Sequence, residues 1–403
     1  MMSSGFMRDA KEDRVLRAKR RIGRTIKSRW RLDELIGLGV TAAVYSATHR
    51  IGTRVAVKML DPDPSLDGAE IKTRFLREAY LANLVEHPGA VRVIDDEVDE
   101  QGSVFLVMEL LDGETLADRI DRNARALTTE EILIVVDRVL DVLAAAHDKH
   151  IVHQDVEPGN IFFTRRGGVR LLDFGFARHR PVTDNPKLAT GRFVSTPPRL
   201  DSTFGTPAYL APEQARRSWS DVDARTDLWA VGAIMFRLLT GRVVHPAETT
   251  TAQLAATRTR RPPRTAALDP AVPICVATVV DKALAFNKHD RWSDARSMQR
   301  AIRDAYRTLT SREAGRFSET TLSLFHDGPP SSGVPGAPDQ DIQPVAPELP
   351  ERSHITPTRG GRHRIRFGAL AAPLGRVAIF AALALAVCVL VTLAHAIWKH
   401  PPF

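Results

Sequence analysis

Cysteine is nearly absent from this chain of 403 residues, which contains only Cys275 and Cys388. The two lie far apart, each within an apolar stretch, so the sequence predicts neither a disulfide framework nor a cysteine metal cluster. We therefore expect a protein of a reducing compartment. With 43% hydrophobic and 26% charged residues, the composition is that of a globular protein with a sizeable core, in one large or two small domains.

A secretion signal is also lacking, because residues 1–29 contain many Arg and Lys but no apolar stretch. We expect this segment to stay in the cytosol as a mobile, solvated basic arm, with a nucleic-acid or lipid site as the alternative. The net charge of +8 is concentrated here and just before an apolar run near the C-terminus. That placement favours attraction to a membrane surface, and no nucleic-acid partner is expected.

Two polar motifs lie in the middle of the chain, HQDVEPGN at residues 153–160 and LLDFG at residues 171–175. Together, and at this spacing, they resemble the catalytic loop and the metal-binding loop of protein kinases. The resemblance implies that Asp155 orients a substrate hydroxyl, while Asn160 and Asp173 hold the Mg²⁺ ions that bridge the phosphates of ATP.

Two residues of the first motif depart from the family pattern. Gln154 stands where the family usually has an Arg that pairs with a phosphorylated activation loop, so activation of that kind is not expected. Glu157 stands where Ser/Thr kinases usually have a Lys that neutralises the transferred phosphoryl group. Two like charges ~4 Å apart cost about 4 kcal/mol at an effective dielectric of ~20, which is roughly three decades in rate. Either another cation compensates, or catalysis is weak.

Upstream, short strands flank Gly37 and Gly39, and a strand that contains Lys58 follows, which resembles the glycine-rich hairpin of the same family. Glycine lets backbone N–H groups approach phosphate oxygens closely. A dinucleotide-binding turn would share the glycines but would need a helix next. By resemblance, Lys58 holds the α- and β-phosphates, and Glu78, on a helix expected over residues 70–86, is its candidate partner.

A buried strand and polar turn at residues 103–113 resemble the kinase hinge, where backbone groups contact adenine. The residues that the resemblance assigns to ATP binding are Ile36, Gly37, Gly39, Val44, Ala56, Lys58, Met108, Glu109 and Leu111. Those that it assigns to catalysis are Asp155, Lys58 and Glu78. Further on, Thr128 and Glu131 form a capping box before an amphipathic helix, which we expect to support the catalytic loop rigidly.

The segment between Gly175 and Ala211 is long and basic, and it leads into GTPAYLAPE, which resembles the peptide-positioning loop of Ser/Thr protein kinases. Kinases of small molecules generally lack this ending, so it favours a protein substrate. We expect Thr206 near Asp155, with its hydroxyl donating to Glu157. Five basic residues of the segment are candidates for the missing cation: Arg178, Arg180, Lys187, Arg192 and Arg199.

Two buried carboxylates are expected to brace these loops. By resemblance, Asp227, at the start of a very apolar helix that ends near Gly241, caps the catalytic loop from below. Glu213 is expected to pair with Arg291 and to brace the peptide-binding loop. The alternative is that either residue is instead an exposed charge.

The C-terminal part reads as a membrane anchor. Residues 328–357 are rich in Pro, Gly and Ser, as in a flexible linker. The run Val377–Trp398 then lacks Asp, Glu, Lys and Arg and is long enough to cross a bilayer as a helix. Arg359, Arg362, Arg364, Arg366 and Arg376 precede it and only Lys399 follows closely, so we expect the kinase-like part inside the cell and the arginines near anionic lipid.

The resemblance thus implies an α+β, two-lobed protein-kinase fold with a small β-rich lobe and a larger helical lobe, and the apolar run predicts a C-terminal transmembrane helix. The expected divisions are a basic arm at 1–29, the kinase domain at 30–308, a Pro/Gly-rich and basic linker at 309–375, the membrane helix at 376–398 and a short outer tail at 399–403.

The function expected by resemblance is a Ser/Thr protein kinase that uses ATP and Mg²⁺ and is tethered to the cytoplasmic membrane by a single pass. A pseudokinase that binds nucleotide or acts as a membrane scaffold is the alternative, favoured by Gln154, Glu157 and Ala42, which replaces the third family glycine. A small-molecule kinase is a third interpretation. The substrate, the activating signal and a homodimeric state are left open by the sequence.

Overall fold

The computed structural model describes residues 12–39, 41–61, 68–122, 127–179 and 206–311, which belong to one compact unit. The predicted linker beyond residue 311, the membrane helix at 376–398 and the tail at 399–403 lie outside the described residues. Among the residues described, no helix is both long enough and apolar enough to span a bilayer.

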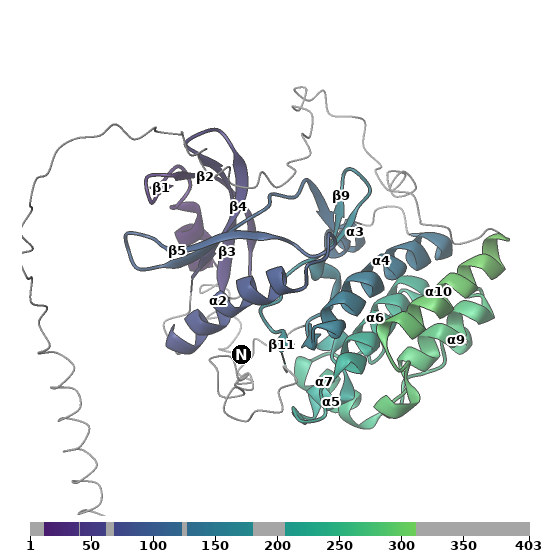
Figure 1. The fold of residues 1–403 in the computed structure, drawn as a ribbon. Coiled ribbons are helices and arrows are strands. Elements are labelled where there is room, and N and C mark those ends of the chain that lie inside the picture. The colour runs from purple at the N-terminus through teal and green to yellow at the C-terminus, as the bar shows by residue number, and fades with distance from the viewer. Residues whose placement is uncertain (1–11, 40, 62–67, 123–126, 180–205, 312–403) are drawn as a thin grey trace, which may run out of the picture. The chain divides into compact units, whose positions relative to one another are not determined.

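The N-terminal lobe is built on a six-stranded antiparallel sheet (Figure 1). In order across the sheet, the strands are β1 (Thr25–Ile26), β2 (Trp30–Leu38), β3 (Ala42–His49), β4 (Arg54–Leu60), β6 (Val104–Met108) and β5 (Val93–Val98). Helix α2 (Gly68–Leu84) packs against β5 and β6, and it begins and ends two residues before the predicted limits. The hairpin β2–β3 and the strand β4 are where the sequence predicted them.

Residues 12–29 differ from the prediction of a mobile, solvated arm. Residues 12–19 are helical, and β1 adds a strand to the edge of the sheet. Ala18 is fully buried and Ile26 is almost so, in a cluster with Tyr45 and Phe105 of the sheet. The many basic residues led to the wrong prediction, because two apolar residues among them, Ala18 and Ile26, pack into this cluster. This part of the arm is therefore a packed element of the lobe.

The C-terminal lobe is mainly helical, as predicted (Figure 1). Its most buried helices are α4 (Thr129–Asp148) and α6 (Ala224–Thr240). The remaining helices are α3 (Leu116–Asp121), α5 (Pro212–Ala215), α7 (Thr250–Thr259), α8 (Thr265–Leu268), α9 (Ile274–Ala283), α10 (Ala295–Thr310) and the 3₁₀ turns Pro158–Asn160, Pro207–Tyr209 and Lys288–Asp290. Two small sheets, β10–β9–β7 and β11–β8, contain β7 (Gly113–Thr115), β8 (Ile151–Val152), β9 (Ile161–Thr164), β10 (Val169–Leu171) and β11 (Arg178–His179).

The predicted capping signals are present at the central helices. Thr128 accepts the N–H of Glu131 at 3.2 Å, and the Glu131 carboxylate accepts the N–H of Thr128 at 2.7 Å, which is the capping box expected before α4. Helix α6 begins after Asp223 and ends at Gly241, whose φ of 69° is the left-handed conformation that glycine adopts without strain. These caps set where the two supporting helices begin and end.

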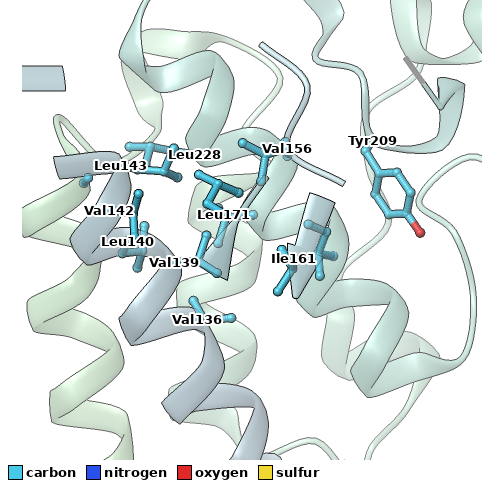
Figure 2. Packing of buried hydrophobic residues seen from close by; sticks show 14 of the residues in the cluster. Val136, Val139, Leu140, Val142, Leu143, Val156, Ile161, Leu171, Tyr209 and Leu228 are labelled. Atoms are coloured by element: carbon cyan, nitrogen blue, oxygen red, sulfur yellow. The ribbon is translucent and has the colours of Figure 1, made fainter. Parts of the chain in front are cut away.

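The apolar face of α4 lies beside the loop that carries the HQDVEPGN motif. Figure 2 shows Val136, Val139 and Leu140 of this helix in one cluster with Val156 of the loop and Leu171 of β10. Each of these side chains is nearly or fully buried, and full burial of a side chain of this size stabilises the fold by about 1.5–3 kcal/mol. The motif is therefore anchored to a rigid helix by its own apolar residues.

Helices α6 and α9 lie close together at Gly232. A β-carbon added there would lie 2.7 Å from the β-carbon of Ala283 and 3.3 Å from Leu284 Cγ, which is closer than such atoms normally pack. The absence of a side chain at Gly232 is therefore what allows the two helices to touch.

Gly232→Ala should lower the free energy of unfolding by about 1–3 kcal/mol in urea denaturation, because overpacking outweighs the better helix propensity of alanine. Ala283→Gly in the same chain should recover part of the loss, since it removes the clashing methyl group. Strictly additive effects of the two substitutions would contradict a direct contact.

Candidate functional site

A cavity of about 540 Å³ lies between the sheet of the N-terminal lobe and the loops of the C-terminal lobe. Every residue of the predicted ATP-binding set lines it except Gly37, which lies within β2. The predicted residues that line it are Ile36, Gly39, Val44, Ala56, Lys58, Glu78, Met108, Glu109, Leu111, Asp155, Asn160, Asp173 and Thr206. The structure therefore brings together residues that span 170 positions in the sequence, from Ile36 to Thr206.

Lys58 is the centre of the ionic contacts in this cavity. Its ammonium donates to Glu78 Oε1 at 2.6 Å and to Asp173 Oδ2 at 3.0 Å. Burial alone would lower the pKa of Lys58, but the charges of Asp173 and Glu78 outweigh it and raise the pKa above its ordinary value. Lys58 is therefore a permanent cation. An ammonium has three donors, so the two carboxylates leave one N–H for a further acceptor such as a phosphate oxygen.

Asp173 is held in an uncommon backbone conformation, with φ of 58°. Its Oδ1 accepts the N–H of Gly175 at 2.9 Å, and a β-carbon at Gly175 would lie only 2.8 Å from that same oxygen. Although burial opposes ionisation, the charge of Lys58 holds the pKa of the Asp173 carboxyl below its ordinary value. The glycine of the DFG sequence thus leaves room for a carboxylate that stays ionised.

Asn160 and Asp155 contact each other directly. Asn160 Nδ2 donates to the Asp155 carbonyl at 2.9 Å and to Asp155 Oδ2 at 3.1 Å. Because the nitrogen of the amide is used in this way, its oxygen is the atom that a cation would bind. The oxygens of Asn160 and Asp173 are hard ligands of the kind that Mg²⁺ prefers, so the side chains fit the predicted ion.

The charges of the cavity also fit a divalent cation. Among the described residues that line it, Lys58 is the one cation, against the acidic Glu78, Glu109, Asp155, Glu157 and Asp173. No group of three or more His, Cys, Asp or Glu side chains is arranged to hold a metal ion within the described part of the chain. A magnesium ion held by one or two side chains and by substrate phosphates satisfies both observations.

Asp227 holds the backbone of the catalytic motif. Its carboxylate accepts the N–H of His153 at 2.9 Å and that of Gln154 at 2.8 Å, and it lies 2.8 Å from His147 Nε2. Gln154 has a φ of 66°, which brings its N–H and that of His153 to the same carboxylate. Asp227 therefore makes contacts that fit its expected role of capping the catalytic loop. The contact from His147, on the last turn of α4, was not predicted, because nothing in its local sequence marks it.

His153 joins the catalytic motif to the segment before Asp173. Its Nε2 lies 3.0 Å from the Leu172 carbonyl, and its Nδ1 accepts the N–H of Asp155 at 3.3 Å, so the proton is on Nε2. Burial lowers the pKa of His153, which keeps the ring neutral, and the ring packs edge-on against Phe174. A neutral histidine can make both contacts at once, and this positions Asp155 relative to Asp173.

Glu157 lies on the cavity wall, and its Oε2 is buried without a hydrogen-bond partner in the described part of the chain. Thr206 lines the same cavity, but the hydrogen bond predicted from its hydroxyl to Glu157 is not formed there. Of the five basic residues proposed to compensate, Arg178 donates to the Trp219 carbonyl at 2.5 Å. The other four lie outside the described residues. The carboxylate of Glu157 therefore faces the cavity uncompensated by any described cation.

Glu213 and Arg291 form the predicted buried pair, and the exposed alternative is wrong. The guanidinium donates to Oε1 at 2.8 Å and to Oε2 at 2.9 Å, and Thr226 donates to Oε1 at 2.8 Å. Arg291 Nε also donates to the Ala285 carbonyl at 2.9 Å. Burial opposes ionisation of Glu213, but these donors, Arg291 foremost, hold its pKa below the ordinary value.

Gln214, which the sequence did not single out, links this pair to the catalytic motif. Its side-chain nitrogen donates to the Gln154 carbonyl at 2.8 Å, and its oxygen accepts the N–H of Ala211 at 3.0 Å. The residue after Glu213 thus ties the peptide-positioning loop to the backbone beside Asp155. Only a side chain of this length with both a donor and an acceptor makes the two contacts.

Comparison with known proteins agrees with this geometry. A family model described as the protein kinase domain matches residues 30–306. The serine/threonine-protein kinase PrkC of Bacillus subtilis is 30% identical over 81% of this chain and 47% of its own length. The probable serine/threonine-protein kinase PknB of Corynebacterium glutamicum is 34% identical over 73% of this chain and 45% of its own. The chain thus spans less than half the length of these curated relatives.

A solved structure is similar as well. The crystal structure of the Mycobacterium tuberculosis PknI kinase domain is 25% identical, with a TM-score of 0.51, and the match covers 70% of this chain and 98% of that one.

Glu213→Gln should lower the free energy of unfolding by about 3–5 kcal/mol at neutral pH, because it leaves Arg291 as a buried charge without its carboxylate. The folded-state pKa of Glu213 is depressed below the ordinary 4.5, so its stabilisation is complete above pH 4.5 and is lost as the pH falls through the folded value. The difference between wild type and variant should therefore shrink below pH 4.5 in urea denaturation.

Glu248→Gln, at an exposed glutamate, is the matched control and should change stability little at any pH. A deficit of Glu213→Gln that stays constant across the acid range would contradict the assigned ion pair.

Proposed function

Because this chain belongs to the protein kinase family, we propose that it transfers the γ-phosphate of ATP to Ser or Thr hydroxyls of proteins. The observation that carries the proposal is the pair of contacts from Lys58 to Glu78 and Asp173, at 2.6 and 3.0 Å, in the same cavity as Asp155 and Asn160. These are the groups that phosphoryl transfer requires for aligning a nucleotide and a hydroxyl.

In this proposal each residue has a separate task. Lys58 uses its remaining N–H to bind a phosphate oxygen, and Glu78 keeps the ammonium in place. Asp155 accepts the hydrogen bond of the substrate hydroxyl, while the amide of Asn160 fixes the orientation of that carboxylate at 3.1 Å. Asn160 and Asp173 hold Mg²⁺, which when bound neutralises charge on the phosphates.

A protein substrate is supported by the loop that ends at α5. Its residues Pro207–Tyr209 form a 3₁₀ turn, and Arg237 donates to the Tyr209 hydroxyl at 2.6 Å. The buried pair of Glu213 and Arg291 braces the end of the loop. A loop held at Tyr209 and at Glu213 is a surface on which an extended peptide can be positioned with its hydroxyl near Asp155. The names of the similar proteins from Bacillus subtilis and Corynebacterium glutamicum, which are serine/threonine-protein kinases, support the same substrate class.

A nucleotide-binding scaffold without useful turnover is the second candidate. It is favoured by Glu157, whose carboxylate is on the cavity wall with a buried, unpartnered oxygen. Negative charge at this position opposes the phosphoryl group that the family lysine would stabilise. The two candidates differ in whether bound nucleotide is turned over.

Asp155→Asn should reduce phosphoryl transfer from radiolabelled ATP to a Ser/Thr protein substrate by about 10²- to 10⁴-fold, because the amide cannot accept the hydroxyl proton. Asp148→Asn, at a half-exposed carboxylate paired with Arg296, is the matched control and should retain activity. Transfer that persists in Asp155→Asn would contradict the assigned role.

Glu157→Lys in the same assay separates the two candidates. If Glu157 weakens the wild-type enzyme, the reversal of charge should raise the rate by up to roughly three decades. Nucleotide binding without transfer, in both wild type and Glu157→Lys, would favour the scaffold.

We also propose that the full chain is anchored in the cytoplasmic membrane by residues 376–398, with the kinase domain in the cytoplasm. The support is the run Val377–Trp398, which has no Asp, Glu, Lys or Arg, together with the five arginines that precede it. Those arginines are also suited to contact anionic headgroups.

The double variant Leu385→Arg/Leu390→Arg should shift the full chain from the membrane fraction to the supernatant after carbonate extraction. Each arginine adds about 2.5–3.5 kcal/mol to the cost of inserting the helix. The control Leu385→Val/Leu390→Val should stay in the membrane fraction. A wild-type chain found in the supernatant would sink the proposed anchor.

A further inference from the structure

The N-terminal arm, defined here as residues 12–26, precedes the part of the chain that the family model matches. It is nevertheless attached to the sheet that carries the nucleotide loop. The Tyr45 hydroxyl of β3 donates to the Ala18 carbonyl at 3.0 Å, and both residues are fully buried. Ile26 of β1 is 6% exposed in the same cluster. The arm is therefore fixed to the lobe by its own packing and by a buried hydrogen bond.

Arg14 reaches from the helical part of the arm to the glycine-rich turn. Its guanidinium donates to the Gly39 carbonyl at 2.5 Å. Gly39 in turn donates its N–H to the Ala42 carbonyl at 2.9 Å, which closes the turn between β2 and β3. Gly39 and Ala42 line the cavity, whereas Arg14 is not among the described residues that line it. Arg14 thus contacts the turn from outside the nucleotide site.

A second contact joins the arm to the strand of Lys58. Asp61 follows directly after β4, is 6% exposed, and donates its N–H to the Thr41 carbonyl at 2.8 Å. Its carboxylate lies 3.3 Å from Arg21 Nη2 and 4.0 Å from Arg14 Nε. A buried carboxylate needs such partners. Arg21 supplies a hydrogen bond to Oδ1, and Arg14 adds a positive charge at 4.0 Å from Oδ2, so the arm, the turn and the end of β4 are one connected group.

We propose that the N-terminal arm is a clamp that holds the glycine-rich turn in the conformation that lines the cavity, with Arg14 as its positioning residue, and that it thereby sets the affinity for ATP. A glycine-rich turn loses much conformational freedom when a ligand orders it. A turn that is already ordered by the arm spares the nucleotide this cost, which strengthens binding. This proposal depends on one part of the proposed function, the binding of ATP in this cavity, and not on phosphoryl transfer.

The test uses the full chain and compares Arg14→Ala with Arg17→Ala. Arg17 is on the same helical stretch, pairs with Asp13 and does not contact the turn, so it is matched in charge and location. Arg14→Ala should weaken ATP binding and raise KM for ATP about three- to tenfold, which matches the usual net contribution of one exposed hydrogen bond. The value of kcat should change less than twofold, because no group at Asp155 or Lys58 is altered.

Two further variants separate positioning from a general loss of structure. Arg14→Lys keeps the charge beside Asp61 and one donor for Gly39, so it should recover part of the affinity. Tyr45→Phe removes only the hydroxyl that holds Ala18, and it should shift ATP affinity in the same direction as Arg14→Ala. Amide hydrogen exchange at Gly39 should be faster in Arg14→Ala and Tyr45→Phe than in wild type or Arg17→Ala.

The readouts keep this inference distinct from the proposed function. If no variant transfers phosphate, the dissociation constant for ATP and the exchange rate at Gly39 still decide whether the clamp exists. Wild-type affinity and exchange in Arg14→Ala would overturn the proposal, and so would equal losses in Arg14→Ala and Arg17→Ala.

Discussion

The ammonium of Lys58, on β4, contacts Glu78 of α2 and Asp173 of the loop after β10. These two residues lie 20 and 115 positions away from it in the sequence. A buried cation is costly unless carboxylates surround it, and here Glu78 and Asp173 both do. The position of α2 against the sheet and the conformation of the Asp173 loop are therefore coupled through one charge. In the proposed clamp, the N-terminal arm adds a further restraint at the end of β4, where Arg14 and Arg21 lie beside Asp61.

In the larger lobe, two buried carboxylates have a comparable role, Asp227 through backbone groups and Glu213 through side chains. Asp227 collects the N–H groups of His153 and Gln154, and Glu213 is enclosed by Arg291 and Thr226. In a low-dielectric interior each such carboxylate is stable only when its acceptors are satisfied. The loops it bonds are therefore held in one conformation, with Gln214 as the bridge between the two sets of contacts.

The charge of the cavity sets its chemistry. Lys58 faces five acidic residues among those described at the lining, and Glu157 is one of them. A polyanionic nucleotide enters such a site favourably only together with divalent cations. Glu157 adds a negative charge where the family usually has a positive one, so the proposed activity depends on how that charge is balanced during transfer.

The sequence predicted the two-lobed fold and the cavity residues through its resemblance to protein kinases, because motifs and their spacing are local properties of the chain. It left open whether Glu213 pairs with Arg291, and the structure decided this. Tertiary structure decided the rest. His147 and Gln214 act through contacts 80 and 60 residues away, and no local pattern encodes such partners. The arm read as solvated because its composition is basic, yet Ala18 and Ile26 are buried. Composition reports average polarity, whereas burial depends on which few side chains meet a surface that exists only after folding.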